Sequence, residues 1–422
     1  MKKLRHFLLA TFALATVALH AQSNKPFSAS ATTTTGTPLT FTASGSNFTD
    51  FVSSIIKTSG SFDQLSNRAF NASATFLGVK DAITFSTNAQ ATSVTLGLKP
   101  INFTQTFTGT SDSDVENQIS DFFEKNGADT IARFLKAVAE QSTVAVTDGN
   151  PNAATAISAA GTFASQGFTP ADEIGNVTAG PTNEEASAGT PSKPKFGGFG
   201  IGFNAGRFEA AGFKGETIDV STTGLSIGFG ERVRLLTPLS ASYLKVEGAQ
   251  VGGVGAGLAL PIRFRVMSKD NPWNWRVTPT GGVSARASID LAGGALLWHA
   301  GVINSIDYRV NPKVVLCLVN QFTAHKSIKL EYGDFSFDPK VDQQIVKTGV
   351  RMVNPLTRRL ILDVFVVDTR FLKKAAVDQF YSAGGSLSLR VSQRFNLSLG
   401  VNYDTGDNYK SYTGGLSSCW KW

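Results

Sequence analysis

Eleven basic residues in the second half of the chain lie close to tight-turn sequences, at the ends of segments in which polar and apolar residues alternate. They are Arg232, Arg234, Arg263, Arg265, Arg276, Arg309, Arg351, Arg359, Arg390, Arg394 and Lys421. If the polar parity of these segments faces a common interior, the basic side chains form a ring at one mouth of it. Because a ring of positive charge inside a low-dielectric wall concentrates anions, this basic ring predicts selection of negatively charged solutes.

Two other interpretations of the basic ring remain open. The side chains could extend to lipid headgroups, or pair with the neighbouring carboxylates of Glu231, Asp307 and Asp363. They could also bind an acidic N-terminal domain. That domain has a cluster of acidic residues on a candidate helix, namely Asp112, Asp114, Glu116, Asp121 and Glu124.

Catalytic and metal-binding patterns are weak in this chain. His325-Lys326-Ser327 has the His-x-Ser spacing by which barrel lipases and deacylases resemble one another, but Ile328 replaces the Asn that often follows. No partner carboxylate is evident, and we interpret His299 as a polar residue facing a lumen. The turn at residues 147–152 lacks the spacing of a calcium loop. We therefore expect no enzyme activity, no cofactor and no metal site.

The elements that must position the basic ring are strands. In residues 394–404, Phe395, Leu397, Leu399, Val401 and Tyr403 occupy one parity, and polar or small residues occupy the other. An alternation of period two over this length excludes a helix. One face suits hydrocarbon and the other suits water, as in a strand of a membrane barrel.

The last segment, residues 409–422, places Tyr412, Leu416, Trp420 and Trp422 on one parity. This ending resembles the C-terminal signature of bacterial outer-membrane β-barrel proteins, with a terminal Trp in place of the commoner Phe and Ser418 at an outward position. The resemblance is to this class of twelve-stranded barrels and to no specific family. It implies that residues 196–422 form a barrel in the cell outer membrane.

The predicted fold is an all-β, antiparallel transmembrane barrel of about twelve strands, preceded by a smaller mixed α/β domain. Tight turns at residues 268–272, 310–312, 353–357 and 392–393 alternate with longer connections such as residues 327–340. We therefore expect the tight turns to face the periplasm, where both termini also lie. The predicted strands are residues 196–206, 216–236, 240–248, 252–267, 273–288, 295–309, 313–326, 341–353, 358–370, 376–391, 393–404 and 409–422.

The N-terminal half divides into shorter parts. Residues 1–21 have the charged start, apolar core and small-residue end of a secretory signal peptide. We expect residues 22–46 to be a flexible leader, residues 47–167 a small α/β domain, and residues 168–195 a disordered linker. Within the domain, Ser113 and Glu116 fit a capping box at the start of a helix.

Charge is distributed unevenly along the chain, whose net charge is +7. Residues 22–194 contain 9 Lys and Arg against 15 Asp and Glu, a balance of −6, whereas residues 195–422 contain 27 against 17, a balance of +10. The basic balance therefore belongs to the barrel and does not indicate nucleic acid as a partner. We expect Cys317 and Cys419 to be free thiols on distant walls.

These observations favour an outer-membrane channel, passive or gated, for small solutes that include anions, with the N-terminal domain as plug or gate. The alternative is a barrel that anchors an N-terminal binding, scaffold or surface domain. Autotransporters also place a barrel after a passenger, but this passenger is short and lacks a β-helix repeat. Expected partners are outer-membrane lipid, the barrel-assembly machinery and an unidentified small solute; the oligomeric state is open.

Overall fold

The computed structural model describes residues 25–65, 68–122, 127–145, 195–230, 232–267, 270–291, 293–332, 335–337, 340–392 and 394–420. It forms two compact units, one centred on the N-terminal half and one on the C-terminal half. No helix among the described residues is long and apolar enough to cross a membrane. The predicted signal peptide, nearly all of the predicted linker, Lys421 and Trp422 lie outside the described residues.

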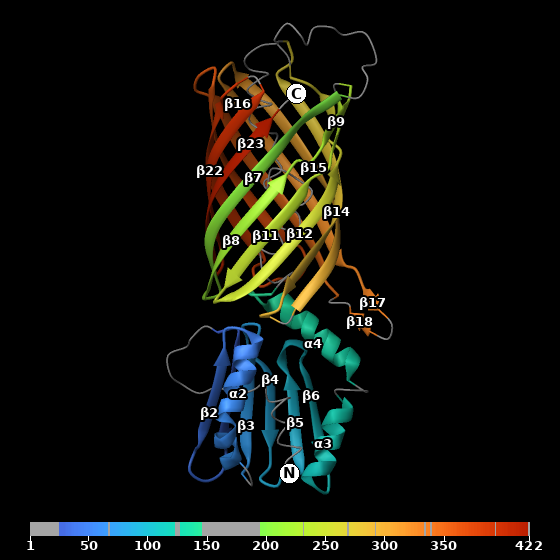
Figure 1. Ribbon diagram of the computed structural model, residues 1–422, viewed down its shortest axis with the longest axis vertical. Coiled ribbons are helices and arrows are strands. Elements are labelled where there is room, and N and C mark those ends of the chain that lie inside the picture. Colours follow the sequence, from blue (N-terminus) through green and yellow to red (C-terminus); the bar gives the residue numbers. More distant parts are fainter. Residues whose placement is uncertain are drawn as a thin grey trace. The chain divides into compact units, whose positions relative to one another are not determined.

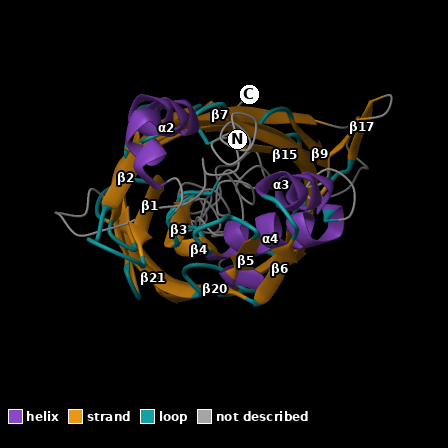
Figure 2. Ribbon diagram, turned by 90° about the horizontal axis from the view of Figure 1, so that it is seen from below, coloured by secondary structure: helices purple, strands orange, loops and turns teal. Residues whose placement is uncertain are grey.

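The N-terminal unit contains a six-stranded antiparallel sheet with the strand order β2-β1-β3-β4-β5-β6. Figure 2 shows helix α2 beside the β2 and β1 edge, and helices α3 and α4 beside the β5 and β6 edge. The elements are β1 (Phe27–Thr33), β2 (Thr40–Gly45), α2 (Phe48–Phe62), η2 (Asp63–Leu65), β3 (Phe70–Phe76), β4 (Val79–Thr87), β5 (Ser93–Leu98), η3 (Lys99–Ile101), β6 (Phe103–Thr108), α3 (Asp112–Asp121) and α4 (Ala128–Gln141).

Strand alternation separates the two faces of this sheet. Phe85, Leu96 and Phe107 lie on the buried face and share a core with Ile119 of α3 and Phe134 of α4. The opposite parity carries small polar residues, among them Ser30, Ser73, Thr84, Thr95 and Thr104. The helix predicted near Ser113 and Glu116 is present as α3.

The prediction of a flexible leader over residues 22–46 is wrong. Residues 27–33 and 40–45 are strands β1 and β2, and β1 pairs with both β2 and β3. The small residues that resemble a low-complexity segment are alternating Ala and Ser or Thr, with Phe27 and Ala31 fully buried. The unit therefore begins at β1 and not near residue 47.

Helix α3 begins two residues earlier than the predicted capping box. Ser111 is the N-cap, and its hydroxyl accepts a hydrogen bond from the amide of Asp114 at 3.2 Å. The Asp114 carboxylate accepts hydrogen bonds from the Thr110 hydroxyl and, at 3.1 Å, from the Thr110 amide. These bonds hold the pKa of Asp114 below its ordinary value. Because the pKa of Asp114 is lower in the folded state than in the unfolded state, its carboxylate stabilises the fold at any pH above its unfolded-state pKa. This stabilisation is lost as the pH falls through the folded-state pKa.

We predict that Ser111→Ala weakens α3, because N-cap loss costs about 1 kcal/mol. Amide exchange of α3 in the full-length protein should become about fivefold faster, since about 1.4 kcal/mol corresponds to tenfold. Ser113→Ala is the matched control and should leave exchange within about twofold. Equal acceleration by the two substitutions would contradict the observed cap.

The C-terminal unit is a closed antiparallel barrel, which Figure 1 shows from green to red. Pairings β7 with β9 and β12 with β14 complete the ring. Its strands are β7 (Lys195–Ala210), β8 (Phe213–Thr222), β9 (Ser226–Phe229), β10 (Val233–Leu236), β11 (Leu239–Val246), β12 (Ala249–Ala259), β13 (Ile262–Arg265), β14 (Trp273–Ser288), β15 (Gly293–Asn311), β16 (Val314–Ser327), β19 (Asp342–Pro355), β20 (Leu360–Phe371), β21 (Gln379–Arg390), β22 (Phe395–Gly406) and β23 (Tyr409–Trp420). A separate hairpin, β17 (Leu330–Tyr332) and β18 (Phe335–Phe337), lies between β16 and β19.

The predicted count of about twelve strands is wrong, since the described residues of the barrel sheet form fifteen strand segments. Breaks at Pro238 and Pro261 separate β10 from β11 and β12 from β13, because proline cannot donate to the ladder. The predicted strand 216–236 is in fact the end of β8 followed by two short strands, β9 and β10, which are joined by a turn at Gly230 with φ +70°. The expected alternation of tight and long connections is also incomplete, because both ends of the barrel have tight turns.

The outer surface of the barrel is an apolar band between two sets of aromatic residues. Leu399 and Val401 in the middle of β22 are 65% and 69% exposed. One aromatic set contains Phe264, Trp273, Trp275, Tyr308, Phe395 and Trp420; the other contains Trp298, Tyr381, Tyr403 and Tyr412. Eight residues separate Tyr412 from Trp420, which is about 27 Å along a strand and about 20 Å of bilayer thickness at a usual tilt.

Candidate functional site: the barrel interior

The inner wall of the barrel carries the polar parity of every long strand. On β22, Asn396 and Asp404 are buried inside, whereas Leu399 and Val401 face out. The wall also contains buried residues of both charge signs, namely Arg276, Arg286, Asp307, Lys347, Arg351, Asp363 and Asp404. Side chains with these charges are rarely buried without partners, so their contacts define the site.

One set of contacts lies near the end of the barrel formed by the turns around residues 270 and 312. Register places Asp307 opposite Cys317, and Cys317 opposite Arg351, on β15, β16 and β19. An Arg351 Nη2 donates to the Cys317 Sγ at 3.8 Å. Asn274 Nδ2 donates to the Asp307 carboxylate at 2.6 Å. A carboxylate, a thiol and a guanidinium therefore line adjacent strands at one level.

Two further pairs join strands that are not neighbours. Lys347 on β19 interacts electrostatically with Asp404 on β22, with β20 and β21 between them. Asn402 Nδ2 donates to the same Asp404 carboxylate at 2.7 Å. On the other side, Arg286 on β14 donates to the Ser242 hydroxyl at 3.1 Å and interacts with the charge of Asp219 on β8. Both basic side chains reach over intervening strands.

The structure places the predicted basic ring in three environments. Six members lie on inward-facing strand positions near the same end of the barrel: Arg234, Arg263, Arg276, Arg309, Arg351 and Arg390. Arg232, Arg359 and Arg394 lie in the turns at that end. Arg265 pairs opposite the outward Trp275 and is itself exposed, so it faces out. The electrostatic role of the ring stays a prediction.

Arg286 and Lys347 are inward basic residues that the sequence reading missed. Each lies on the polar parity of its strand but far from a tight turn, whereas the predicted ring contains only basic residues near tight turns. With them, the described inner wall has eight basic residues and four acidic residues (Asp219, Asp307, Asp363 and Asp404), an excess of four positive charges. The excess is concentrated toward the end where the ring members lie.

The structure also locates the residues of the C-terminal signature, the two cysteines and the His-x-Ser sequence. Tyr412, Leu416 and Trp420 are 62%, 48% and 40% exposed on the outer face of β23. Cys317 and Cys419 are both free and lie on β16 and β23, with four strands between them in the sheet. His325 of the His-x-Ser sequence faces the interior, opposite His299 and Gln343. Within the described residues, no group of three or more His, Cys, Asp or Glu could hold a metal ion.

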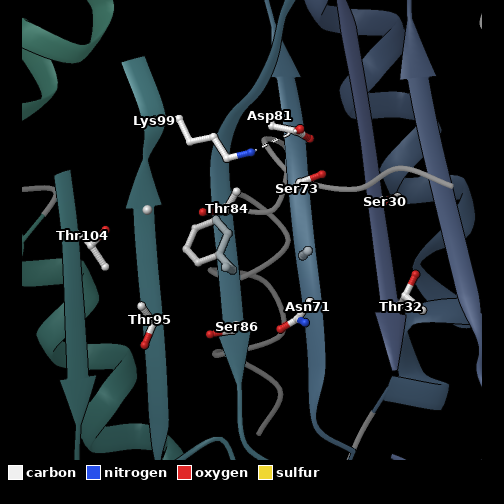
Figure 3. Close-up of a pocket in the computed structure, with 13 residues that line it drawn as sticks. Ser30, Thr32, Asn71, Ser73, Asp81, Thr84, Ser86, Thr95, Lys99 and Thr104 are labelled. Atoms are coloured by element: carbon white, nitrogen blue, oxygen red, sulfur yellow. Dashed lines mark ion pairs between the residues drawn. The ribbon is translucent and has the colours of Figure 1, made fainter. Parts of the chain in front are cut away.

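A second candidate site lies on the exposed face of the N-terminal sheet. An open cavity of about 490 Å³ lies there. Figure 3 shows that its lining includes the hydroxyl groups of Thr32, Ser73, Thr84 and Thr95, which come from several strands. Lys99 and Asp81 form an ion pair of 3.3 Å at one side of it. Thr95 and Thr106 hydroxyls hydrogen-bond across strands at 2.9 Å. The sequence alone does not indicate this cavity, because alternating Ser and Thr residues are also typical of an ordinary solvent-exposed strand.

A closed antiparallel sheet with an apolar exterior, aromatic bands and a charged interior belongs in a bilayer. The C-terminal half of the chain is an outer-membrane β-barrel. The chain matches no protein-family model and no curated protein. It is similar in structure to the translocator domain of autotransporter NalP from Neisseria meningitidis, with 13% identity, a TM-score of 0.40, and coverage of 56% of this chain and 90% of that one.

Two other solved structures are similar to the barrel at the same level. The β-domain of a Bordetella autotransporter has 12% identity and a TM-score of 0.40, covering 53% of this chain and 98% of that one. An outer-membrane channel from Pseudomonas putida F1 has 13% identity and a TM-score of 0.40, covering 57% of this chain and all of that one. At these identities and TM-scores, the likenesses assign no activity to this chain.

We predict that Asp404→Asn destabilises the barrel by about 3 kcal/mol, because it leaves Lys347 buried without its countercharge. Asp368→Asn is the matched control: Asp368 faces out and pairs with the exposed Arg370 at 2.7 Å, so its loss should cost under about 1 kcal/mol. Urea unfolding of the barrel from lipid vesicles measures both. Equal midpoints for the two variants would show that the Lys347 and Asp404 pair contributes nothing.

Proposed function

We propose that the barrel is a narrow outer-membrane channel that favours small anionic solutes. The observation that carries this proposal is the inner wall, where eight basic residues outnumber four acidic residues and cluster toward one mouth. Cation-lined constrictions select anions, and a low-dielectric wall strengthens the field inside. Because Asp307 and Asp363 neutralise part of this charge, the selectivity is partial.

The N-terminal unit is the second part of the proposal, as the plug or gate of the channel. Its supporting observations are a hydrophobic core of its own and the acidic balance of residues 22–194. Opposite net charges on the two halves favour their association at low ionic strength, and salt weakens it over a Debye length of about 8 Å at physiological strength. Gating should therefore depend on salt.

A second candidate function is an anchor, in which the barrel holds the N-terminal unit at the membrane and that unit binds a ligand. The hydroxyl-lined cavity of about 490 Å³ on its sheet favours this alternative. Hydroxyl and amide groups with one ion pair suit a polar, neutral ligand. In this case the barrel need not conduct.

Planar-bilayer recordings of the full-length protein test the channel. We predict that the reversal potential of the unaltered protein indicates a preference for anions. The double substitution Arg263→Gln and Arg390→Gln should move this potential toward zero, because both residues occupy inward positions. Arg263→Gln alone should reduce it by a smaller amount, and Arg265→Gln is its matched control, since it removes one positive charge from the outer face two residues away. It should leave selectivity unchanged.

Two results would overturn the channel. Equal shifts in the inward and outward variants would show that the field does not come from the interior. An absence of conductance, both in the full-length protein and after deletion of the N-terminal unit from β1 to α4 (residues 27–141), would leave the barrel as an anchor. Conductance only after the deletion would support the plug.

A further inference from the structure

The two histidines of the barrel face each other across neighbouring strands inside it. The chain has 4 His, and the other two, His6 and His20, fall in the predicted signal peptide. His299 on β15 is the direct register partner of His325 on β16. Their exposed fractions are 2% and 0%. The two residues are 26 positions apart in the chain, so the sequence alone does not indicate that they form a pair.

The state of the His299 ring is unusual for a structural histidine. Among the residues that the structure describes, neither ring nitrogen of His299 has a hydrogen-bond partner. Buried polar side-chain atoms are hydrogen-bonded in the large majority of cases, so a buried ring with two unmatched nitrogens requires an explanation. A neutral imidazole with an available nitrogen is the commonest metal ligand in proteins.

The surrounding wall is shaped for this ring. A Cβ added at Gly282 would lie 2.7 Å from the His299 Cε1, so the ring occupies the space that a side chain at position 282 would need. Gln343 lies opposite His325. Its side-chain amide oxygen accepts hydrogen bonds from the backbone amides of Gln344 at 2.9 Å and Lys373 at 3.1 Å. The Gln343 side chain is therefore held in place by backbone groups.

We propose that His299 and His325 form a binding site for a divalent transition-metal ion inside the barrel. Directly opposed strand residues have Cβ atoms about 5 Å apart. Metal to imidazole bonds of about 2.1 Å place two ligand nitrogens about 3.3 Å apart, which opposed imidazoles can reach. Imidazole suits copper, zinc and nickel, and Cu²⁺ binds most tightly among these ions. Water or a small anion completes the coordination, and the site does not depend on the proposed channel.

Titration of the full-length protein in detergent with Cu²⁺, followed by electron paramagnetic resonance, tests the site. We expect one saturable ion per chain with hyperfine structure from two nitrogens. Loss of second-shell partners alone weakens metal binding by about 10 to 100-fold, so His299→Ala and His325→Ala should each weaken it at least that much. Ser327→Ala, on the same strand and inner face as His325, is the matched control and should bind normally.

Each variant is checked for folding by comparing its migration on gels with and without prior heating, because a folded barrel migrates differently from the heat-denatured chain. A second measurement needs no substitution: Zn²⁺ should slow the modification of His299 and His325 by diethyl pyrocarbonate in the unaltered protein. The proposal is overturned if Cu²⁺ binding does not saturate, if His299→Ala and His325→Ala keep full affinity, or if Zn²⁺ leaves the modification rate unchanged.

Discussion

Backbone amide and carbonyl groups inside a bilayer have no water to bind, and this constraint determines the form of the C-terminal half. Each unsatisfied group costs several kcal/mol in hydrocarbon, so spanning strands must close on themselves. The pairings of β7 with β9 and β12 with β14 complete that closure. Proline interruptions at Pro238 and Pro261 are tolerated because neighbouring strands continue the ladder around them.

Once the sheet is closed, strand parity assigns every side chain to lipid or interior. A one-residue shift would exchange the two sets, so the apolar band and the charged wall specify the register together. The inner wall then has to hold buried charges of both signs. It does so through contacts across strands, in which Lys347 meets Asp404 and Arg286 meets Asp219. The same wall brings His299 and His325 together.

Much of the barrel could be predicted from one sequence, because parity is local. The alternation over residues 394–404 predicted β22, and β14 has the expected bounds of residues 273 and 288. Where the local signal is weak, the prediction failed. Strands β1 and β2 contain mostly Ala, Ser and Thr, whose small side chains resemble a flexible segment, and the β9 to β10 hairpin has four residues in each strand.

The contents of the interior could be predicted only in part. Inward arginines near turns were identifiable from parity, whereas Lys347 and Asp404 are 57 residues apart and meet only when the barrel closes. Cross-barrel contacts of this kind depend on the tilt and stagger of all the strands, which a single sequence does not specify. The two histidines differ in this respect, because they lie on the neighbouring strands β15 and β16 and meet through the register of that single pair.

The central claim is that parity divides the barrel into a lipid face and a polar interior. Nitroxide labels placed singly at residues 395–404 in the full-length protein, folded into lipid vesicles, test it directly. The account predicts that accessibility to oxygen is highest at odd positions, greatest near Leu399 and Val401, and that a polar relaxation agent prefers even positions. Uniform accessibility, or a period other than two, would contradict it.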